Sequence, residues 1–417
     1  MPTNVACSRQ ALGGRLVLVG DTSGSISVLD ASRPGEMQCR ARWLVHRNCI
    51  FGMALAKGDR TVLTGSADAT ARAIDIERGS VAATFRGHKM TLRCLAAHCD
   101  NANIFLSGGR DGRICAFDTR DLSKYRSGDD AAGPPTVMPV RSCPDLHASA
   151  GARSGSSGGG GSSSSAGQAG AAAGGGAAVT ALAHVSGTPL CVSGGADGHV
   201  RVWDLRMLRT RAWERSDAVS EFAPSQQGRV GWAQGSAPAA AAPGSASGSL
   251  LGRSRSSGAG AAAARGVTSL SVSPSGARLA VASLDNAVRV YRVGRLGLGP
   301  EFVLGGYRAF GFYSSVAMAP DGEAVLAASA DGCARIWTLH DEPEDAAERS
   351  RHAGASCRAG SVPEADAWWA SVPVAAPRMV LPSGPVCQSR VVYDVAWSAG
   401  SSEAVAVTAS ADHSRPL

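Results

Sequence analysis

Lysine and aromatic residues are scarce in this chain of 417 residues. Only Lys57, Lys89 and Lys124 among its 41 basic residues are lysines, and it has 8 Trp, 8 Phe and 5 Tyr. The net charge is +7, but the basic residues are spread along a chain that is also rich in Ala and Gly. This pattern indicates a compositional bias, because affinity for nucleic acid needs a clustered basic face. Direct binding of nucleic acid is therefore not expected.

Long apolar runs and paired cysteines are absent as well. No stretch of 18 apolar residues occurs, which excludes a membrane-spanning helix, and Met1–Gln10 has no apolar signal-peptide core. The 11 cysteines are scattered without a CxxC pair, which argues against a disulfide framework. The cytosol or the nucleus is therefore the default compartment.

One sequence unit recurs seven times. It consists of a short apolar strand, a Ser/Thr-Gly/Ala-x-x-Asp segment and a second strand that ends in an aromatic-Asp-like pair. The units cover residues 15–30, 61–75, 104–118, 189–204, 278–291, 324–337 and 404–412. Asp-Gly at 111–112, 197–198 and 331–332 is typical of hairpin turns, and Asp68 precedes Asp111 by 43 residues. A period of about 40–45 residues with four strands per unit predicts an all-β, seven-bladed WD40 β-propeller.

Three intervals between units are longer than this period. Residues 126–178 are rich in Gly, Ser and Ala, residues 233–265 in Ala, Gly and Ser, and residues 341–385 are charged and then Pro-rich. Such compositions bury too little apolar surface to offset the entropy of ordering, so we predict disordered insertions between blades. The ordered parts of the single propeller are then expected at about 4–125, 179–232, 266–340 and 386–412.

The last blade is expected to be incomplete. Val391–Ser398 and Ala404–Thr408 can form its first two strands, but His413–Leu417 is too short to supply two more. Asn4–Ser8 would then flank an unpaired edge. Either a truncated chain or an imperfectly closed ring fits this pattern.

Several polar residues recur at equivalent places in the units and are expected to fasten the blades. They are His88, Ser107 and Asp111 in the third unit, Ser193, Asp197 and Trp203 in the fourth, and Asp331 and Trp337 in the sixth. No histidine is evident for the fourth unit, and Phe117 replaces the usual Trp in the third. Because the pattern recurs, a catalytic Ser-His-Asp triad is not expected.

The sequence motifs give little support for a metal site or a phosphate-binding site. Cys94, His98 and Cys99 form one small cluster, but no second cluster would complete a four-ligand zinc site, so we predict no metal. No GxxxxGK[ST] loop is present, and no cofactor is expected. The propeller also offers no constellation that would make it an enzyme.

The most informative motif is Asp-x-Arg directly after the third strand of two consecutive units. It occurs as Asp118-Thr119-Arg120 and as Asp204-Leu205-Arg206. One such arginine fits a local salt bridge to its aspartate. Two in consecutive blades place two guanidinium groups at equivalent positions on one face, where arginine suits bidentate contact with a partner protein.

These features resemble the denticleless protein homolog family, whose members are WD40 substrate receptors of cullin-4 RING ubiquitin ligases. The resemblance is carried by the two Asp-x-Arg boxes and by five stretches of the chain. These are WLVHRNCIFGMAL (43–55), FRGHKMTLRCLAAH with IFLSGGRDGRICAFDTR (85–98 and 104–120), VSGGADGHVRVWDLR (192–206) and FYSSVAMAPDGEAVLAASADGCARIW (312–337), followed by VYDVAWSAGSSEAVAVTASAD (392–412).

The resemblance implies a non-catalytic receptor subunit. Asp118, Arg120, Asp204 and Arg206 would bind the DDB-type adaptor of the ligase. The opposite face would receive substrates whose degron is displayed on DNA-loaded PCNA, during replication or after DNA damage. The family's long C-terminal tail is absent from this sequence. The main alternative is a general WD40 interaction scaffold in chromatin assembly or trafficking, in which the two arginines are only structural.

Overall fold

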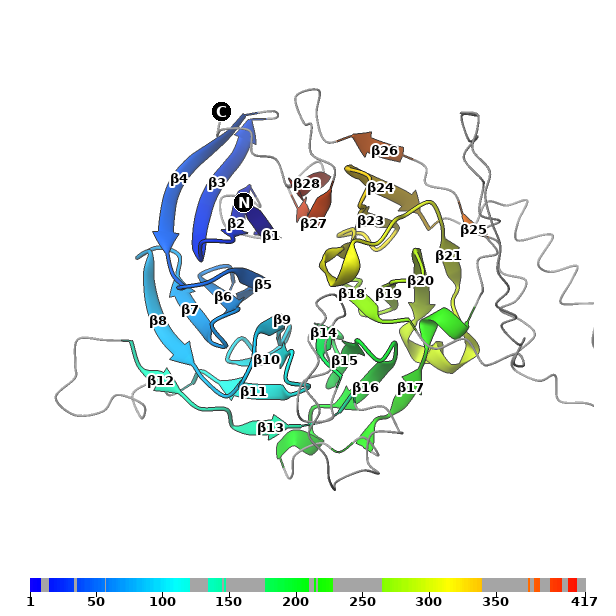
Figure 1. Ribbon diagram of the computed structural model, residues 1–417, viewed down its shortest axis with the longest axis horizontal. Coiled ribbons are helices and arrows are strands. Elements are labelled where there is room, and N and C mark those ends of the chain that lie inside the picture. The colour runs from blue at the N-terminus through cyan, green and yellow to red at the C-terminus, as the bar shows by residue number, and fades with distance from the viewer. Residues whose placement is uncertain are drawn as a thin grey trace, which may run out of the picture.

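The computed structural model describes most of the repeat units and part of the segments between them. The described residues are 1–8, 15–33, 36–56, 58–120, 134–144, 146–147, 177–209, 214, 217–227, 265–339, 374–375, 379–382, 391–399 and 404–410. Their strands form seven sheets arranged around a central channel (Figure 1). Among these residues, six sheets have four or five strands and the seventh has two. The fold is therefore an all-β WD40 β-propeller with six complete blades.

Each blade is built from strands that follow one another from the channel outward. Blade 1 contains β1 (Pro2–Cys7), β2 (Leu16–Asp21), β3 (Ser25–Arg33) and β4 (Glu36–Leu44). Blade 2 contains β5 (Ile50–Ala56), β6 (Thr61–Ser66), β7 (Ala71–Asp75), β8 (Ser80–Phe85) and β12 (Thr136–Val137). Blade 3 contains β9 (Leu92–Ala97), β10 (Ile104–Gly109), β11 (Ile114–Asp118) and β13 (Arg141–Cys143).

The second half of the ring repeats this order. Blade 4 contains β14 (Val179–His184), β15 (Leu190–Gly195), β16 (Val200–Asp204) and β17 (Ser220–Phe222). Blade 5 contains β18 (Val267–Val272), β19 (Arg278–Ser283), β20 (Ala287–Arg292), β21 (Phe302–Leu304) and β25 (Val374–Ala375). Blade 6 contains β22 (Val316–Met318), β23 (Ala324–Ala328), β24 (Cys333–Thr338) and β26 (Met379–Pro382). The two-stranded sheet contains β27 (Val392–Ala399) and β28 (Ala404–Ser410), and short 3₁₀ turns occur at η3 (Met207–Arg209), η5 (Pro224–Gln226), η6 (Val293–Leu298) and η7 (Gly311–Tyr313).

The antiparallel pairing gives the ring two distinct faces. The hairpin between the second and third strands of each blade turns at an aspartate, as at Asp111, where Gly112 adopts a φ of 72° that glycine tolerates. The innermost strands begin on the same side, which we call the Asp-turn face. The third strands end on the other side, which we call the Asp-x-Arg face because Asp118 and Asp204 are the last residues of β11 and β16.

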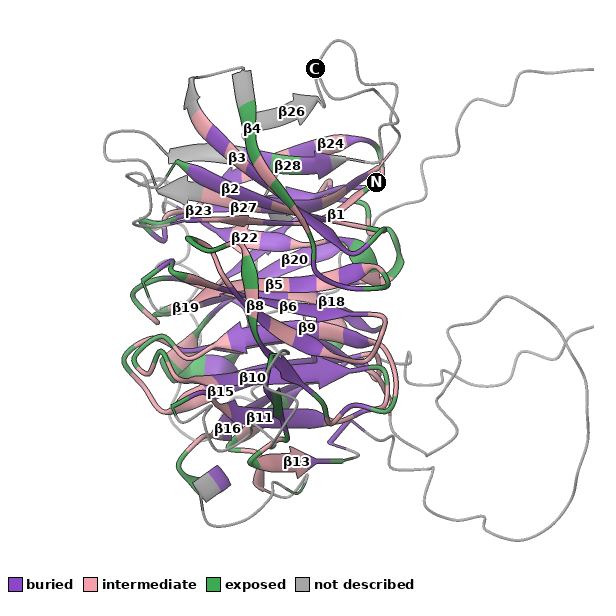
Figure 2. Ribbon diagram, turned by 90° about the vertical axis from the view of Figure 1, so that its left-hand side faces the viewer, coloured by how far each residue is buried: buried purple, intermediate pink, exposed green. Residues whose placement is uncertain are grey.

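The hydrophobic core lies between neighbouring blades. One cluster joins blades 3 and 4 through Cys94, Ile114, Val179 and Trp203, which are all buried. Exposed residues gather in the loops and on outer strands such as β4 and β8, whereas the strands inside the ring are largely buried (Figure 2). Adjacent blades therefore hold one another in a fixed orientation through packed side chains.

Two segments between blades contain strands that the sequence did not predict. β12 pairs in parallel with β8 before the chain returns as β13, and β25 pairs in parallel with β21 before the chain returns as β26. The insertions predicted at 126–178 and 341–385 are therefore wrong where these strands lie. Val137 and Cys143 are buried, so even these short apolar stretches are held by the outer edges of the blades. The rest of both ranges, and residues 233–264, lie outside the described residues.

The seventh unit of the sequence forms the sheet of β27 and β28, as its two predicted strands suggested. A full seventh blade is not confirmed, and Asp412 lies outside the described residues. Asn4–Ser8 does not flank an open edge: most of it belongs to β1, the innermost strand of blade 1. There the buried Asp394 carboxylate of β27 accepts the Val5 backbone N–H at 2.7 Å and the Asn4 amide at 3.1 Å. These bonds join the two ends of the ring.

None of the helical segments in the described ranges is long and apolar enough to cross a membrane.

Candidate functional site

The polar residues predicted in blade 3 form a continuous chain of hydrogen bonds. His88 Nδ1 lies 3.0 Å from Asp111 Oδ1, and His88 Nε2 lies 2.7 Å from the Ser107 hydroxyl. Asp111 also accepts the backbone N–H of Lys89 at 2.8 Å. Because His88 precedes β9 and Asp111 lies in the β10–β11 turn, the trio fastens loop, strand and turn together on the Asp-turn face.

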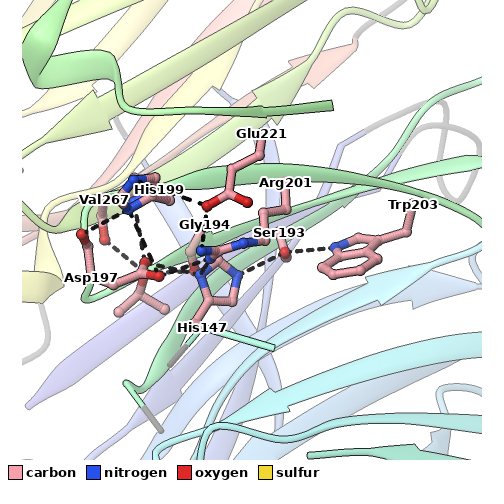
Figure 3. A network of polar contacts seen from close by, with 10 residues as sticks. His147, Ser193, Gly194, Asp197, His199, Arg201, Trp203, Glu221 and Val267 are labelled. Atoms are coloured by element: carbon pink, nitrogen blue, oxygen red, sulfur yellow. Dashed lines mark hydrogen bonds and ion pairs between the residues drawn. The ribbon is translucent and has the colours of Figure 1, made fainter. Parts of the chain in front are cut away.

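Blade 4 contains a larger version of the same network. Trp203 Nε1 donates to Ser193 Oγ at 2.8 Å, and that hydroxyl lies 2.8 Å from His147 Nε2 (Figure 3). His147 Nδ1 in turn lies 2.9 Å from Asp197 Oδ1. Arg201 completes the network, because it donates to Asp197 at 2.8 Å and to Glu221 at 2.7 Å. Both the arginine and His147 are fully buried.

His147 was missed by the sequence analysis, which found no histidine for this blade. It lies within residues 126–178, which were predicted to be a disordered insertion, although the pair Leu146-His147 immediately precedes the Gly/Ser-rich run. Blade 2 has an unpredicted counterpart as well: His46 lies 3.0 Å from Asp68 and 2.8 Å from the Thr64 hydroxyl. Three consecutive blades are thus fastened by a histidine.

Arginines on the third strands are a second feature that the sequence did not predict; Arg201 and Arg289 are fully buried, and Arg335 is partly buried. Arg201, Arg289 and Arg335 occupy the third strands of blades 4, 5 and 6, and each forms an ion pair with the aspartate of its own hairpin turn. All three stand two residues before the aromatic residue of the strand, in an Arg-x-aromatic pattern. This recurring pattern was the available signal, and it accounts for the ion pair of Asp331.

The His-Ser-Asp trios do not have the accessibility of a catalytic triad. Ser107 and Ser193 are both 0% exposed, so neither hydroxyl can reach a substrate carbonyl. The same arrangement recurs in blade 2 with threonine in place of serine. Both facts indicate that these residues stabilise the fold.

The two buried tryptophans of the third strands differ in their hydrogen bonding. Trp203 donates to Ser193, whereas Trp337 Nε1 is buried and has no hydrogen-bond partner among the described residues. We expect Trp203→Phe to cost about 1 kcal/mol more unfolding free energy than Trp337→Phe, because only the former removes a hydrogen bond. Urea denaturation of both variants measures the difference, and equal losses would contradict the assigned role of the indole.

The two network histidines have opposite pKa shifts. For His88, burial lowers the pKa, but hydrogen bonds with Asp111 and Cys115 outweigh burial and raise the pKa from 6.5 to about 9. For His147, complete burial lowers the pKa, and the nearby positive charge of Arg201 lowers it too. These two effects outweigh Asp197, which raises the pKa. His88 is therefore protonated at neutral pH, whereas His147 is neutral and Arg201 supplies the positive charge in its place.

A pH dependence of stability follows from His88. Because its pKa in the folded protein is about 9, above the ordinary value of 6.5, its ion pair stabilises the fold fully below about pH 6.5. This contribution is lost as the pH rises through about 9. We expect the unfolding free energy of the wild type to fall more steeply over this range than that of His88→Gln. Guanidinium denaturation at several pH values tests this, and parallel pH profiles would contradict it.

The predicted Cys94, His98 and Cys99 cluster does not form one site. Cys94 is buried between blades 3 and 4, whereas Cys99 is exposed. His98 instead stacks on His184 at a ring-centroid distance of 3.9 Å, with the Asp100 carboxylate nearby. Both rings accept backbone N–H groups at Nδ1, so each neutral ring carries its proton on Nε2. Neither Nε2 then offers a lone pair to a metal ion.

The two Asp-x-Arg boxes adopt the same local geometry. Asp118 accepts the Arg120 backbone N–H at 3.0 Å and the Nε of the same side chain at 2.8 Å. Asp204 accepts the Arg206 backbone N–H at 2.9 Å and its Nη2 at 2.7 Å. The carboxylates, first through direct hydrogen bonding and then through their charge, raise the pKa of both guanidinium groups. Each aspartate thus closes the turn after its strand and orients the arginine.

Both guanidinium groups remain accessible to solvent. The Arg120 side chain is 56% exposed and the Arg206 side chain is 74% exposed. In blade 2, Asp75 closes the same turn by accepting the Glu77 N–H at 3.0 Å, but no arginine stands two residues after it. The turn therefore recurs in blades 2, 3 and 4, and the arginine two residues after the aspartate occurs in blades 3 and 4.

The pair lies at equivalent positions of adjacent blades. Asp118 pairs with Ile104 and Asp204 pairs with Leu190, so both boxes follow the same register position of the third strand. β9 packs against β14, which makes blades 3 and 4 direct neighbours (Figure 1). Both arginines therefore project from the Asp-x-Arg face, one blade apart.

Comparison with known proteins agrees with this architecture. Residues 79–118, 173–204, 260–292 and 303–338 match the WD domain, G-beta repeat family. The chain is 26% identical over 328 residues to the denticleless protein homolog of Danio rerio, an alignment that covers 78% of this chain and 42% of the relative. The protein lethal(2)denticleless of Drosophila melanogaster is 25% identical, with 79% of this chain and 38% of the relative covered.

The denticleless protein homolog of Homo sapiens is 24% identical over 74% of the chain and 36% of the relative. The chain is similar to the denticleless family. It spans about two fifths of the length of the curated relatives that it matches.

Proposed function

We propose that this propeller is the substrate-recognition subunit of a cullin-4 RING ubiquitin ligase. It would dock the DDB-type adaptor through Arg120 and Arg206 and hold replication and cell-cycle proteins associated with PCNA on its opposite face. The observation that carries the proposal is the pair of exposed, equally oriented guanidinium groups on one face of adjacent blades. Similarity to the denticleless family supports it.

The local chemistry of the Asp-x-Arg face suits a protein partner. Each arginine is held by its own aspartate through Nε and Nη2, and within the described ranges Nη1 makes no hydrogen bond. A partner carboxylate or carbonyl can therefore bind an already oriented donor, which lowers the entropic cost of association. Met207, which follows the second arginine directly, is 41% exposed and adds apolar surface.

The proposed role needs no catalytic residue in this chain. A receptor that holds an adaptor and a substrate at once raises the local concentration of the substrate near the ligase. The reaction itself would take place on other subunits, in the nucleus where DNA-loaded PCNA is found. This division of labour fits a fold whose Ser, His and Asp residues are used to fasten blades.

Direct binding of the purified adaptor to the immobilised chain tests the proposal. We expect saturable binding that survives physiological salt, and recovery of the adaptor and cullin when the tagged chain is purified from cells. Absence of adaptor binding, together with co-purification of partners unrelated to ubiquitin ligases, would replace the proposal by a general scaffold role.

A further inference from the structure

A cavity opens into the central channel on the Asp-turn face. It has a volume of about 460 Å³ and is lined by the beginnings of the innermost strands and by the segment that precedes β22. Phe51, Arg93, Phe310, Tyr313 and Tyr393 stand in its wall. They come from blades 2, 3 and 6 and from the two-stranded sheet, so only the closed ring brings them together. We call these five residues the aromatic mouth.

The rings of the aromatic mouth pack against one another. Tyr313 lies 6.0 Å from Phe51, 6.4 Å from Phe310 and 6.5 Å from Tyr393, between ring centroids. The Arg93 guanidinium lies 5.0 Å from the centroid of Phe51 and 4.7 Å from that of Tyr313. It also donates to the backbone carbonyl of Phe312 at 2.9 Å, which fixes the segment that carries Tyr313.

The outer part of the mouth is open to solvent. Phe310 is 42% exposed and Tyr313 is 46% exposed, although both are large and apolar. Exposed aromatic side chains around a concave site mark binding surfaces, because they offer a large apolar area at low entropic cost. A cavity of this size admits one or two large side chains and excludes a folded domain.

Asp394 in the cavity wall is buried and accepts the Asn4 amide and the Val5 N–H. The six aspartates of the hairpin turns on the Asp-turn face each have a basic partner within the propeller. The pairs are Asp21 with Arg42, Asp68 with His46, Asp111 with His88, Asp197 with Arg201, Asp285 with Arg289 and Asp331 with Arg335. An arginine or His88 therefore balances the negative charge of five of these aspartates, and Asp68 is hydrogen-bonded by His46 and Thr70.

The basic residues of the same face that lie outside these pairs are in the opposite situation. Six of them in the described ranges are exposed, namely Arg47, Arg86, Lys89, Arg110, Arg265 and Arg308. None of the six side chains forms an ion pair with another residue of the described ranges. The loops around the mouth therefore present an uncompensated positive charge, which attracts an acidic partner.

We propose that the aromatic mouth binds an acidic peptide segment of a partner protein, with one aromatic side chain of the segment inserted among its rings. The acidic residues on either side of this anchor would contact the exposed bases of the surrounding loops. This site deepens the proposed receptor function and rests on it for the source of the peptide. A single-stranded nucleic acid fits less well, because the rings form one cluster at one opening rather than a row along a groove.

The test uses fluorescence anisotropy with three labelled twelve-residue peptides and the full chain. The first peptide carries a central Trp flanked by Asp and Glu, the second has Ala in place of Trp, and the third has Lys in place of the acids. We expect the first to bind at least about tenfold more tightly than the other two. Equal affinities, or no binding of the first peptide, would overturn the proposal.

Variants locate the site. Tyr313→Ala and Phe310→Ala should each weaken the first peptide by about tenfold, because they remove the stacking surface. Lys89→Glu combined with Arg308→Glu should weaken it and reduce its dependence on salt. Leu298→Ala is the matched control for the loss of exposed apolar area, since Leu298 is 55% exposed in η6, away from the mouth.

A charge-reversal control on the other face and a nucleic-acid probe distinguish peptide binding at the mouth from nonspecific charge effects and from binding of nucleic acid. Arg60→Glu with Arg78→Glu reverses two exposed charges on the Asp-x-Arg face and should leave peptide affinity unchanged. A labelled oligonucleotide of twelve thymidines that binds more tightly than the acidic peptide, and is weakened by the same mouth variants, would overturn the peptide proposal in favour of nucleic acid. Peptide binding is measured without the adaptor, so its failure is distinct from a failure of adaptor docking.

Discussion

Replacing both Arg120 and Arg206 by alanine is expected to lower the affinity of the chain for the adaptor by more than about 100-fold. Each guanidinium group is oriented by its own aspartate and exposed to solvent, so a partner can bind it without reorganisation. Arginines held in this way are typical energetic hot spots of interfaces. Each single variant should lose about tenfold. Biolayer interferometry with purified adaptor measures these losses.

The double variant should fold as the wild type does. Its only lost contacts within the described ranges are ion pairs at the surface, which contribute little to stability. The matched control is Arg60→Ala with Arg295→Ala, which removes the same charge from exposed positions on the Asp-x-Arg face of blades 2 and 5. A similar loss of adaptor binding in this control would mean that overall charge matters and that the pair of boxes has no special role.

The blades and the two boxes could be predicted because their signals are local. Alternating apolar residues, an Asp-Gly turn and an Asp-x-Arg segment each fall within a few residues of sequence, and the antiparallel hairpin then fixes their register. The structure places Asp118 and Asp204 at the ends of their strands, where each accepts the backbone N–H of the arginine two positions later. Their binding of an adaptor stays a prediction.

The missed residues depend on contacts between distant parts of the chain. His147 lies 46 residues before Ser193, and the Gly/Ser-rich composition of the segment between them gave no sign of their contact. β12 and β25 are two-residue strands held by the edge of a preceding blade, and strands this short carry no periodic pattern. The aromatic mouth assembles residues from four sheets, so no single unit of the repeat could reveal it.

The second large effect is expected from Asp197→Ala, which should destabilise the fold by about 3–5 kcal/mol. Arg201 and His147 are both fully buried, and Asp197 is the carboxylate that contacts both. Its pKa shows the strength of this contact: burial raises it, but hydrogen bonds and charges of the two partners lower it to about 2. Without the carboxylate, the Arg201 guanidinium charge stays buried, and Glu221 is the one acidic partner left to it among the described residues.

Blade 6 provides the matched control for this prediction. Asp331 pairs with Arg335 in the same turn, but its side chain is 28% exposed, and no histidine of the described ranges joins the pair. Asp331→Ala should therefore cost only about 1 kcal/mol, as for a pair near the surface.

The double variant Asp197→Ala with Arg201→Met should recover most of the loss of the single variant, because it removes the buried charge together with its partner. Guanidinium denaturation followed by tryptophan fluorescence measures all three. Equal losses in blades 4 and 6, or no recovery in the double variant, would show that packing around His147, and not the buried charge, holds blade 4 together.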